Sequence, residues 1–216
     1  MWIRIIIGTT ILALLAIQDL LKNGQQATRW REYAYLILCV AVAIAYGIAN
    51  DQITARISWE YFYYGKNLAP ILGPPPPYLL AVYIQALRIG ASATWWFGLV
   101  AGAAILIANN PQAGLPRLSY PSLCGRLPSL VSIVALFAVV GGIAGYFYLL
   151  IWIDADFPDL IKYDLWRPRR FMTVYGIHLG GYVGGVVAVS YNVWKIRRSR
   201  RKAAIILTEP IDTTSS

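Results

Sequence analysis

The residues of this sequence that could do chemistry are ionisable side chains next to long apolar stretches. His178 is the only histidine of the chain and lies inside such a stretch, and Asp51 lies at the end of another. Glu60 follows Asp51 in the next polar segment. Carboxylates and an imidazole can transfer protons when burial and neighbouring charges adjust their pKa values. We therefore take Asp51, Glu60 and His178 as the candidate catalytic residues.

Further polar and aromatic residues are expected at the same level and could bind a ligand there. These candidate binding residues are Gln52, Arg88, Trp95, Trp96, Tyr175 and Tyr182. Two carboxylates and one imidazole could also bind a cation. A lone histidine with no second one at ligand spacing argues against that, so we predict no metal site. The alternative to any active site is a network of salt bridges and hydrogen bonds that attaches a loop to the helices.

The composition assigns these residues to a membrane protein. Of 216 residues, 58% are hydrophobic and 13% charged, whereas soluble domains average roughly 45–50% apolar and about 25% charged residues. The formal net charge of +9 could suggest a nucleic-acid partner, but the basic residues form no face interleaved with exposed aromatics. We expect the lipid bilayer as the surrounding partner, other membrane-protein subunits as further candidates, and no nucleic acid.

Five apolar stretches are long enough to cross a membrane, which takes about 20 helical residues for roughly 30 Å of hydrocarbon. They cover residues 3–21, 33–49, 90–108, 130–153 and 171–194. The predicted fold class is all-α, a polytopic transmembrane helical bundle with four core spans and a fifth, N-terminal span. A signal peptide or an interfacial helix is the alternative for residues 3–21.

The predicted single domain covers residues 1–194 and is followed by a basic tail at 195–216. An outer loop at 50–89 contains four consecutive prolines, which cannot continue a helix. Lysine and arginine mark the cytoplasmic side of membrane proteins, and six of them lie between residues 195 and 202. We therefore expect a multi-pass protein of the bacterial inner membrane with a cytoplasmic C-terminus, and the candidate site residues toward the outer face.

Glycines at four-residue spacing recur in three of the predicted spans. They are Gly90, Gly98 and Gly102, then Gly141 and Gly145, then Gly176, Gly180 and Gly184. Small residues at this spacing let helix backbones approach closely in a bilayer. The last span would pack through its glycine face and present Tyr175, His178 and Tyr182 on the opposite face.

Several motifs make the chain similar to a family of small uncharacterised bacterial membrane proteins with the pattern YGxxHDQxT…EYF…ATWWxG…H. Here the stretches are YGIANDQIT at 46–54, EYF at 60–62 and ATWWFG at 93–98, with His178 and Tyr182 in the last span. The resemblance covers roughly residues 40–190, assigns no activity, and leaves the N-terminal helix as an addition to a four-span unit. Asn50 stands where the family usually has histidine. The positions that the resemblance marks are Asp51, Gln52, Glu60, Tyr61, Phe62, Trp95, Trp96 and His178.

Three functions fit these observations. The first is a structural or accessory component of a membrane complex, which the glycine faces and dense aromatics favour. The second is a membrane-embedded enzyme whose Asp51, Glu60 and His178 act on a lipid or lipid-linked substrate at the outer leaflet. The third is a small transporter, although polar residues do not follow a path across the full membrane. No nucleotide-binding loop, zinc signature or haem-attachment pair is present, so the sequence names no cofactor.

Overall fold

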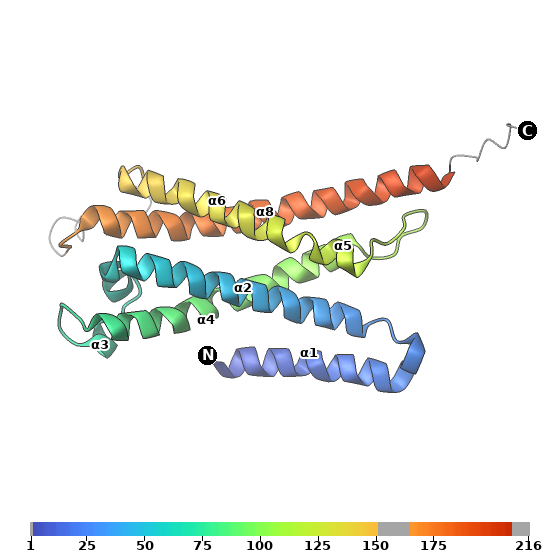
Figure 1. The fold of residues 1–216 in the computed structure, drawn as a ribbon, viewed down its shortest axis with the longest axis horizontal. Coiled ribbons are helices and arrows are strands. Elements are labelled where there is room, and N and C mark those ends of the chain that lie inside the picture. The colour runs from blue at the N-terminus through green and yellow to red at the C-terminus, as the bar shows by residue number, and fades with distance from the viewer. Residues whose placement is uncertain (1, 151–164, 209–216) are drawn as a thin grey trace, which may run out of the picture.

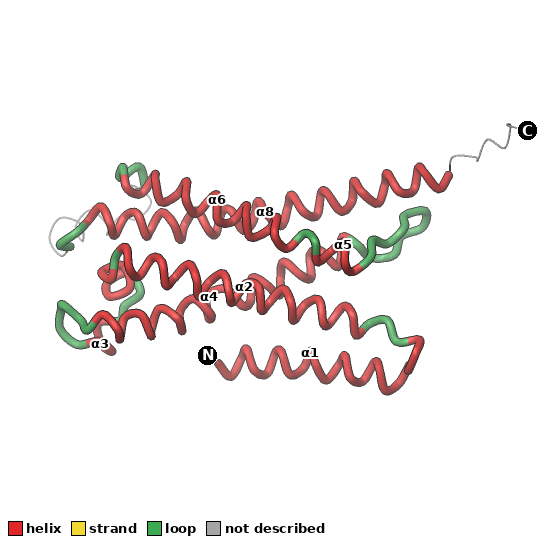
Figure 2. The backbone as a smooth tube through the Cα atoms, in the orientation of Figure 1, coloured by secondary structure: helices red, strands yellow, loops and turns green. Residues whose placement is uncertain are grey.

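A computed structural model of the chain describes residues 2–150 and 165–208 as a bundle of long helices (Figure 1). The five long helices are α1 (Trp2–Asn23), α2 (Trp30–Ile57), α4 (Leu79–Ala108), α6 (Leu127–Tyr146) and α8 (Pro168–Thr208). Along this described part of the chain, Figure 2 shows helices joined by loops and no strands. By length and composition, all five long helices could cross a membrane. The predicted all-α polytopic bundle is therefore confirmed.

The helices differ in extent from the predicted spans. α2 ends at Ile57 and α4 begins at Leu79, so Asp51, Gln52 and Arg88 lie within helices and the connecting segment covers 58–78 instead of 50–89. The reason is that polar residues at the end of an apolar stretch do not stop a helix, whereas the prolines at 74–77 prevent α4 from starting earlier.

The later helices differ from the predicted spans as well. α6 ends at Tyr146, before the predicted limit at 153. The last three residues of that predicted span, 151–153, lie outside the described part of the chain. α8 begins with Pro168, which suits the first helical position, and continues to Thr208. The first 14 residues of the predicted basic tail are therefore helical, because arginine and lysine are good helix formers.

The helices pack as two antiparallel hairpins, α2 with α4 and α6 with α8 (Figure 1). Glycines lie where the backbones meet. A Cβ added at Gly98 would lie 2.6 Å from the Cys39 carbonyl oxygen in α2, and one added at Gly180 would overlap the Phe137 carbonyl group in α6. Neither position has room for a side chain, so glycine sets the close approach within each hairpin.

α1 lies at the edge of the bundle and packs mainly on α2 (Figure 1). Its outer apolar side chains, including Ile3, Ile6 and Ile7, are exposed in the isolated chain, as expected for a helix that faces lipid. The turn to α2 is held by Asp19, whose Oδ2 accepts a hydrogen bond of 2.9 Å from the Trp30 backbone N–H.

The two hairpins contact each other less extensively than their own helices do. Two clusters of buried apolar residues hold them together at opposite ends of the bundle. One includes Phe62, Val82, Phe171 and Met172, and the other includes Tyr35, Ile105, Leu123 and Ile196. Between these clusters the hairpins are separated by the cavities described below.

Candidate functional site

Asp51 of α2 and His178 of α8 come together where the two hairpins meet. The Asp51 Oδ1 and His178 Nε2 atoms are 3.8 Å apart, and the Asp51 residue is only 3% exposed. Thr54, one turn beyond Asp51 on the same face of α2, places its hydroxyl oxygen 3.4 Å from the same nitrogen. Two segments 127 positions apart in the chain thus form one buried polar cluster.

The hydrogen bonds around Thr54 assign the ring proton of His178. The Thr54 hydroxyl donates to the Asn50 carbonyl oxygen at 2.9 Å, so its lone pairs are available to accept. The Asp51 carboxylate is also an acceptor when ionised. Nε2 therefore faces two acceptors, which favours the neutral imidazole with its proton on Nε2.

The Asp51 carboxylate is only partly satisfied. Its Oδ1 accepts a hydrogen bond of 3.3 Å from the Asn50 side-chain amide, while its buried Oδ2 has no hydrogen-bond partner among the described residues. A buried acceptor without a donor is unfavourable by about 1–3 kcal/mol. The cluster therefore has room for one more hydrogen-bond donor at Oδ2.

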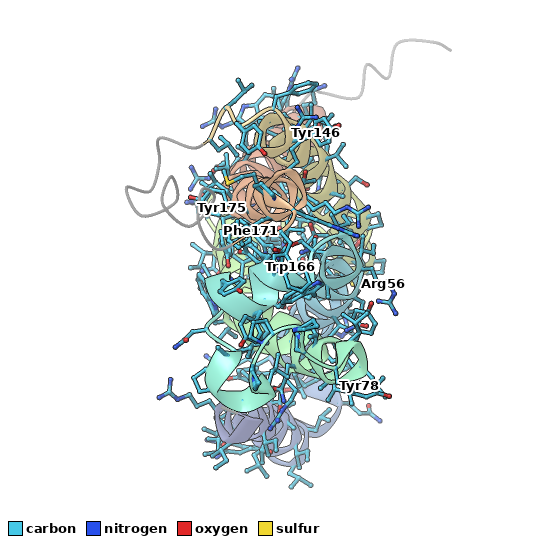
Figure 3. The ribbon with its side chains drawn as sticks, turned by 90° about the vertical axis from the view of Figure 1, so that its left-hand side faces the viewer. Arg56, Tyr78, Tyr146, Trp166, Phe171 and Tyr175 are labelled. Carbon is cyan, nitrogen blue, oxygen red and sulfur yellow. The ribbon has the colours of Figure 1, made fainter. Side chains whose placement is uncertain are left out.

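An aromatic wall covers the cluster. Shortly after α2, the short π-helix η2 (Tyr61–Gly65) folds back onto the helix end, and the Tyr61 ring stacks on the His178 ring with centroids 4.8 Å apart. Phe62 meets the same imidazole edge-on at 6.1 Å. Figure 3 views the bundle from this end and shows Phe171 and Trp166 between the hairpins, with Arg56 and Tyr78 at the periphery. The wall separates His178 from water at this end.

Lys66 completes the cover and adds a positive charge. Its ammonium nitrogen lies 5.3 Å from the centre of the Tyr61 ring. Burial lowers the pKa of Lys66, and the negative charge of Asp51 opposes this shift. Burial likewise raises the pKa of Tyr61, which keeps its hydroxyl protonated.

A cavity of about 120 Å³ between the hairpins extends from this cluster into the bundle. Its polar lining lies at one end, with Asn50, Asp51, Thr94, His178 and Tyr182. The remaining lining is almost all apolar, down to Cys39, Leu127 and Leu130. Trp96 and Tyr182 are about half exposed at 48% and 52%, so the cavity opens toward the lipid-facing side of α4 and α8.

A second groove, of about 500 Å³, lies between α2 and α6. It shares Tyr46, Asn50 and Ile177 with the first cavity and is also lined by Thr54. The polar cluster therefore lies between two apolar hollows at the junction of the hairpins.

Glu60 and Arg88 do not join Asp51 and His178. The Glu60 carboxylate accepts hydrogen bonds from the backbone N–H groups of Trp166, at 2.6 Å, and Arg167, at 3.2 Å. It attaches the segment before α8 to the first hairpin. Arg88 is exposed on α4. The predicted convergence of four ionisable residues is thus limited to two.

The candidate binding residues also separate into different places. Gln52 donates to the Tyr83 carbonyl oxygen at 2.8 Å and so ties α2 to α4. Trp96 and Tyr182 line the cavity. Trp95 lies toward α1, with its ring 4.0 Å from a Cβ built on Gly8, and Tyr175 packs against the apolar cluster around Phe62.

Asn50 and Thr54 are cluster residues that were not among the predicted site residues. The signal was present in the sequence, because Asp51 and Thr54 have the three-residue spacing that shares a helix face. This spacing predicts a shared face only if the helix is continued past residue 49, the end of the predicted span. Among the described residues, no three histidine, cysteine or acidic side chains are grouped to hold a metal ion.

Comparison of the chain with protein-family models, curated proteins and solved structures found no match. The resemblance to a family of small bacterial membrane proteins therefore stays a prediction.

Proposed function

We propose that this multi-pass membrane protein binds a lipid or lipid-linked molecule between its two hairpins. It then carries out acid–base chemistry on the polar part of that molecule. The observation that carries the proposal is the Asp51–His178 pair, with Asp51 Oδ2 unpaired among the described residues, at the polar end of an otherwise apolar cavity. A ligand hydroxyl or amide could donate to Oδ2.

The lining supports an amphipathic ligand more than an ion or a sugar. Apolar side chains form most of the cavity wall, and the polar groups are confined to one end. Binding sites of this kind match the apolar and polar parts of a ligand separately. The exposed Trp96 and Tyr182 at the opening allow such a molecule to arrive from the bilayer.

Each residue of the cluster has a chemical role in this proposal. His178 is the group that takes or gives a proton, since imidazole is the usual general acid or base near neutral pH. Asp51 orients the ring and stabilises its charged form, and Thr54 fixes the same nitrogen. Tyr61 and Phe62 exclude water, which strengthens these electrostatic interactions.

Filling the cavity tests the binding step. An added Cβ at Gly181, which lines the cavity, would approach only the Tyr46 hydroxyl, at 4.0 Å. Gly181→Leu should therefore fill the cavity and leave the fold intact, whereas Val183→Leu, at an exposed position of the same helix, is the matched control. The measurement is mass spectrometry of the lipids retained after purification in mild detergent.

We expect Gly181→Leu to deplete one lipid species at least tenfold and Val183→Leu to retain it. Asp51→Asn and His178→Gln should change the amount of that species and abolish its turnover in a reconstituted membrane. Identical lipid profiles in wild type, Gly181→Leu and Asp51→Asn would refute the proposal.

The second candidate function is a structural or accessory component of a larger membrane complex. It is favoured by Glu60, a charged residue near the same end whose hydrogen bonds to Trp166 and Arg167 join two segments of the chain. The Asp51–His178 pair would then join α2 and α8 in the same way. This candidate predicts stoichiometric partner subunits after purification in mild detergent, and a monodisperse protein that runs alone would count against it. A small transporter is disfavoured because the cavity beyond Thr94 is apolar.

A further inference from the structure

A second feature, at the end of the bundle opposite Asp51, is a groove of about 740 Å³ between the start of α2 and the segment that includes α5 (Tyr120–Cys124). It shares no lining residue with the cavity near His178, and its lining has a different chemistry. Arginines and a serine lie at its polar rim, and its floor is apolar, with Ala34, Leu38 and Leu118.

The rim carries two arginines from different segments. Arg31 lies at the start of α2, with its guanidinium 5.5 Å from the centre of the Trp30 ring, and Arg117 precedes α5. Arg117 is 3.6 Å from Glu32, an exposed ion pair that contributes little. Both guanidinium groups can still donate hydrogen bonds to an anion, since each has five N–H groups.

One buried hydrogen-bond donor of the groove lining lacks a strong acceptor. The Tyr35 side chain lines the groove and is 3% exposed. Its hydroxyl lies near the Cys39 thiol, a weak acceptor, and makes no hydrogen bond of normal geometry among the described residues. A groove with two arginines at its rim and a hydroxyl donor in its lining is suited to phosphate oxygens.

We propose that this groove binds one anionic phospholipid, with its phosphate group between Arg31 and Arg117 and an acyl chain along Ala34 and Leu38. The charge selects an anionic headgroup, because basic pockets between transmembrane helices bind such lipids. The exposed Leu38 side chain continues the apolar floor toward the surrounding hydrocarbon. Free phosphate would use the rim and leave the floor empty, so the floor favours the lipid. This proposal does not depend on the chemistry at His178.

The test compares lipid retention by native mass spectrometry of the full chain after purification from vesicles of phosphatidylcholine with 20 mol% phosphatidylglycerol. The double substitution Arg31→Gln and Arg117→Gln removes the rim charges. Arg197→Gln with Arg198→Gln removes two exposed charges from α8 at the same end and is the matched control. Tyr35→Phe removes one buried donor with little change of volume, and keeps the proposal testable if the double variant does not fold.

We expect the wild type to retain one phosphatidylglycerol molecule in preference to phosphatidylcholine. The rim variant should bind it roughly 25-fold more weakly, since each basic residue near an anionic headgroup contributes about fivefold. Tyr35→Phe should weaken it a few-fold, and the α8 control should leave it unchanged. Equal retention of both lipids, equal loss in the control, or the same thermal stabilisation by inorganic phosphate alone would overturn the proposal.

Discussion

Arg200 provides the sharpest prediction about the stability of this fold. Its side chain is 2% exposed and donates to four backbone carbonyl groups at the end of α4 and in the following loop. The donor–acceptor distances are 2.7 Å to Ala108, 2.7 Å to Asn110, 2.9 Å to Pro116 and 3.3 Å to Leu115. Arg200 therefore joins the second hairpin to the first at the end opposite His178.

The magnitude follows from these bonds. A hydrogen bond to a charged group contributes roughly 1.5–3 kcal/mol, and a buried carbonyl left without a donor is unfavourable. Only the bond to Ala108 is fully buried. Water can reach the other three carbonyl groups once the side chain is gone, so these bonds contribute less to the loss. We expect Arg200→Met to reduce the free energy of unfolding by about 3–5 kcal/mol. At roughly 2–4 °C per kcal/mol, the melting temperature should fall by about 6–20 °C.

The assay is thermal unfolding in detergent, followed by tryptophan fluorescence. Arg201→Met, at the exposed neighbouring position, is the control and should change the melting temperature by about 2 °C at most. Arg200→Lys keeps the charge but cannot donate to several carbonyl groups at once, so it should fall between the two. If Arg200→Met melts within 2 °C of Arg201→Met, the reasoning about this side chain is refuted.

Two further substitutions test packing and burial. Gly180→Leu should yield no monodisperse protein in size-exclusion chromatography, because its Cβ would overlap the Phe137 carbonyl group; a normal elution profile would contradict close packing in the second hairpin. Lys66→Met should raise the melting temperature at pH 7, because burial lowers the pKa of Lys66. Between that lowered pKa and 10.5, the unfolded chain binds more protons, so wild-type stability rises with pH. The advantage of Lys66→Met should shrink as the pH approaches 10.5, and an advantage that grows would contradict this sign.

Apolar stretches and the prolines at 74–77 were sufficient to predict the fold, because crossing a bilayer requires long helices whatever their partners. Helix ends were less predictable, since a helix continues through Asp51 and Arg88 without a breaker. If α2 and α4 are continued through these residues, helix geometry also predicts that Arg88 points away from Asp51. Gly90 faces α2 in the close contact with Gly47, and Arg88 lies two residues, about 200°, away around the helix.

The candidate site could be predicted only in part. The pairing of Asp51 with His178 followed from their predicted depth on the same side of the membrane. The position of Glu60 could not be predicted. The short π-helix η2 changes the direction of the chain after α2, and no residue pattern in the sequence predicts that change. In the sequence, Arg200 is one of six basic residues between 195 and 202 and so resembles an ordinary charge of a basic tail. Its spacing of four from the buried Ile196 and of eight from the buried Asn192 is the signal that it belongs to a packed face.

The pairing of neighbouring helices has a consequence for biosynthesis. Along the described residues, α4 is the next long helix after α2, and α8 is the next long helix after α6. Each hairpin can therefore form its glycine contacts once its own second helix has been inserted. Joining the hairpins then requires only the contacts at the two ends, around His178 and around Arg200. Helices in a bilayer insert first and associate afterwards. The cavity between the hairpins is thus closed last, at a stage when lipid already surrounds both halves and can be enclosed between them.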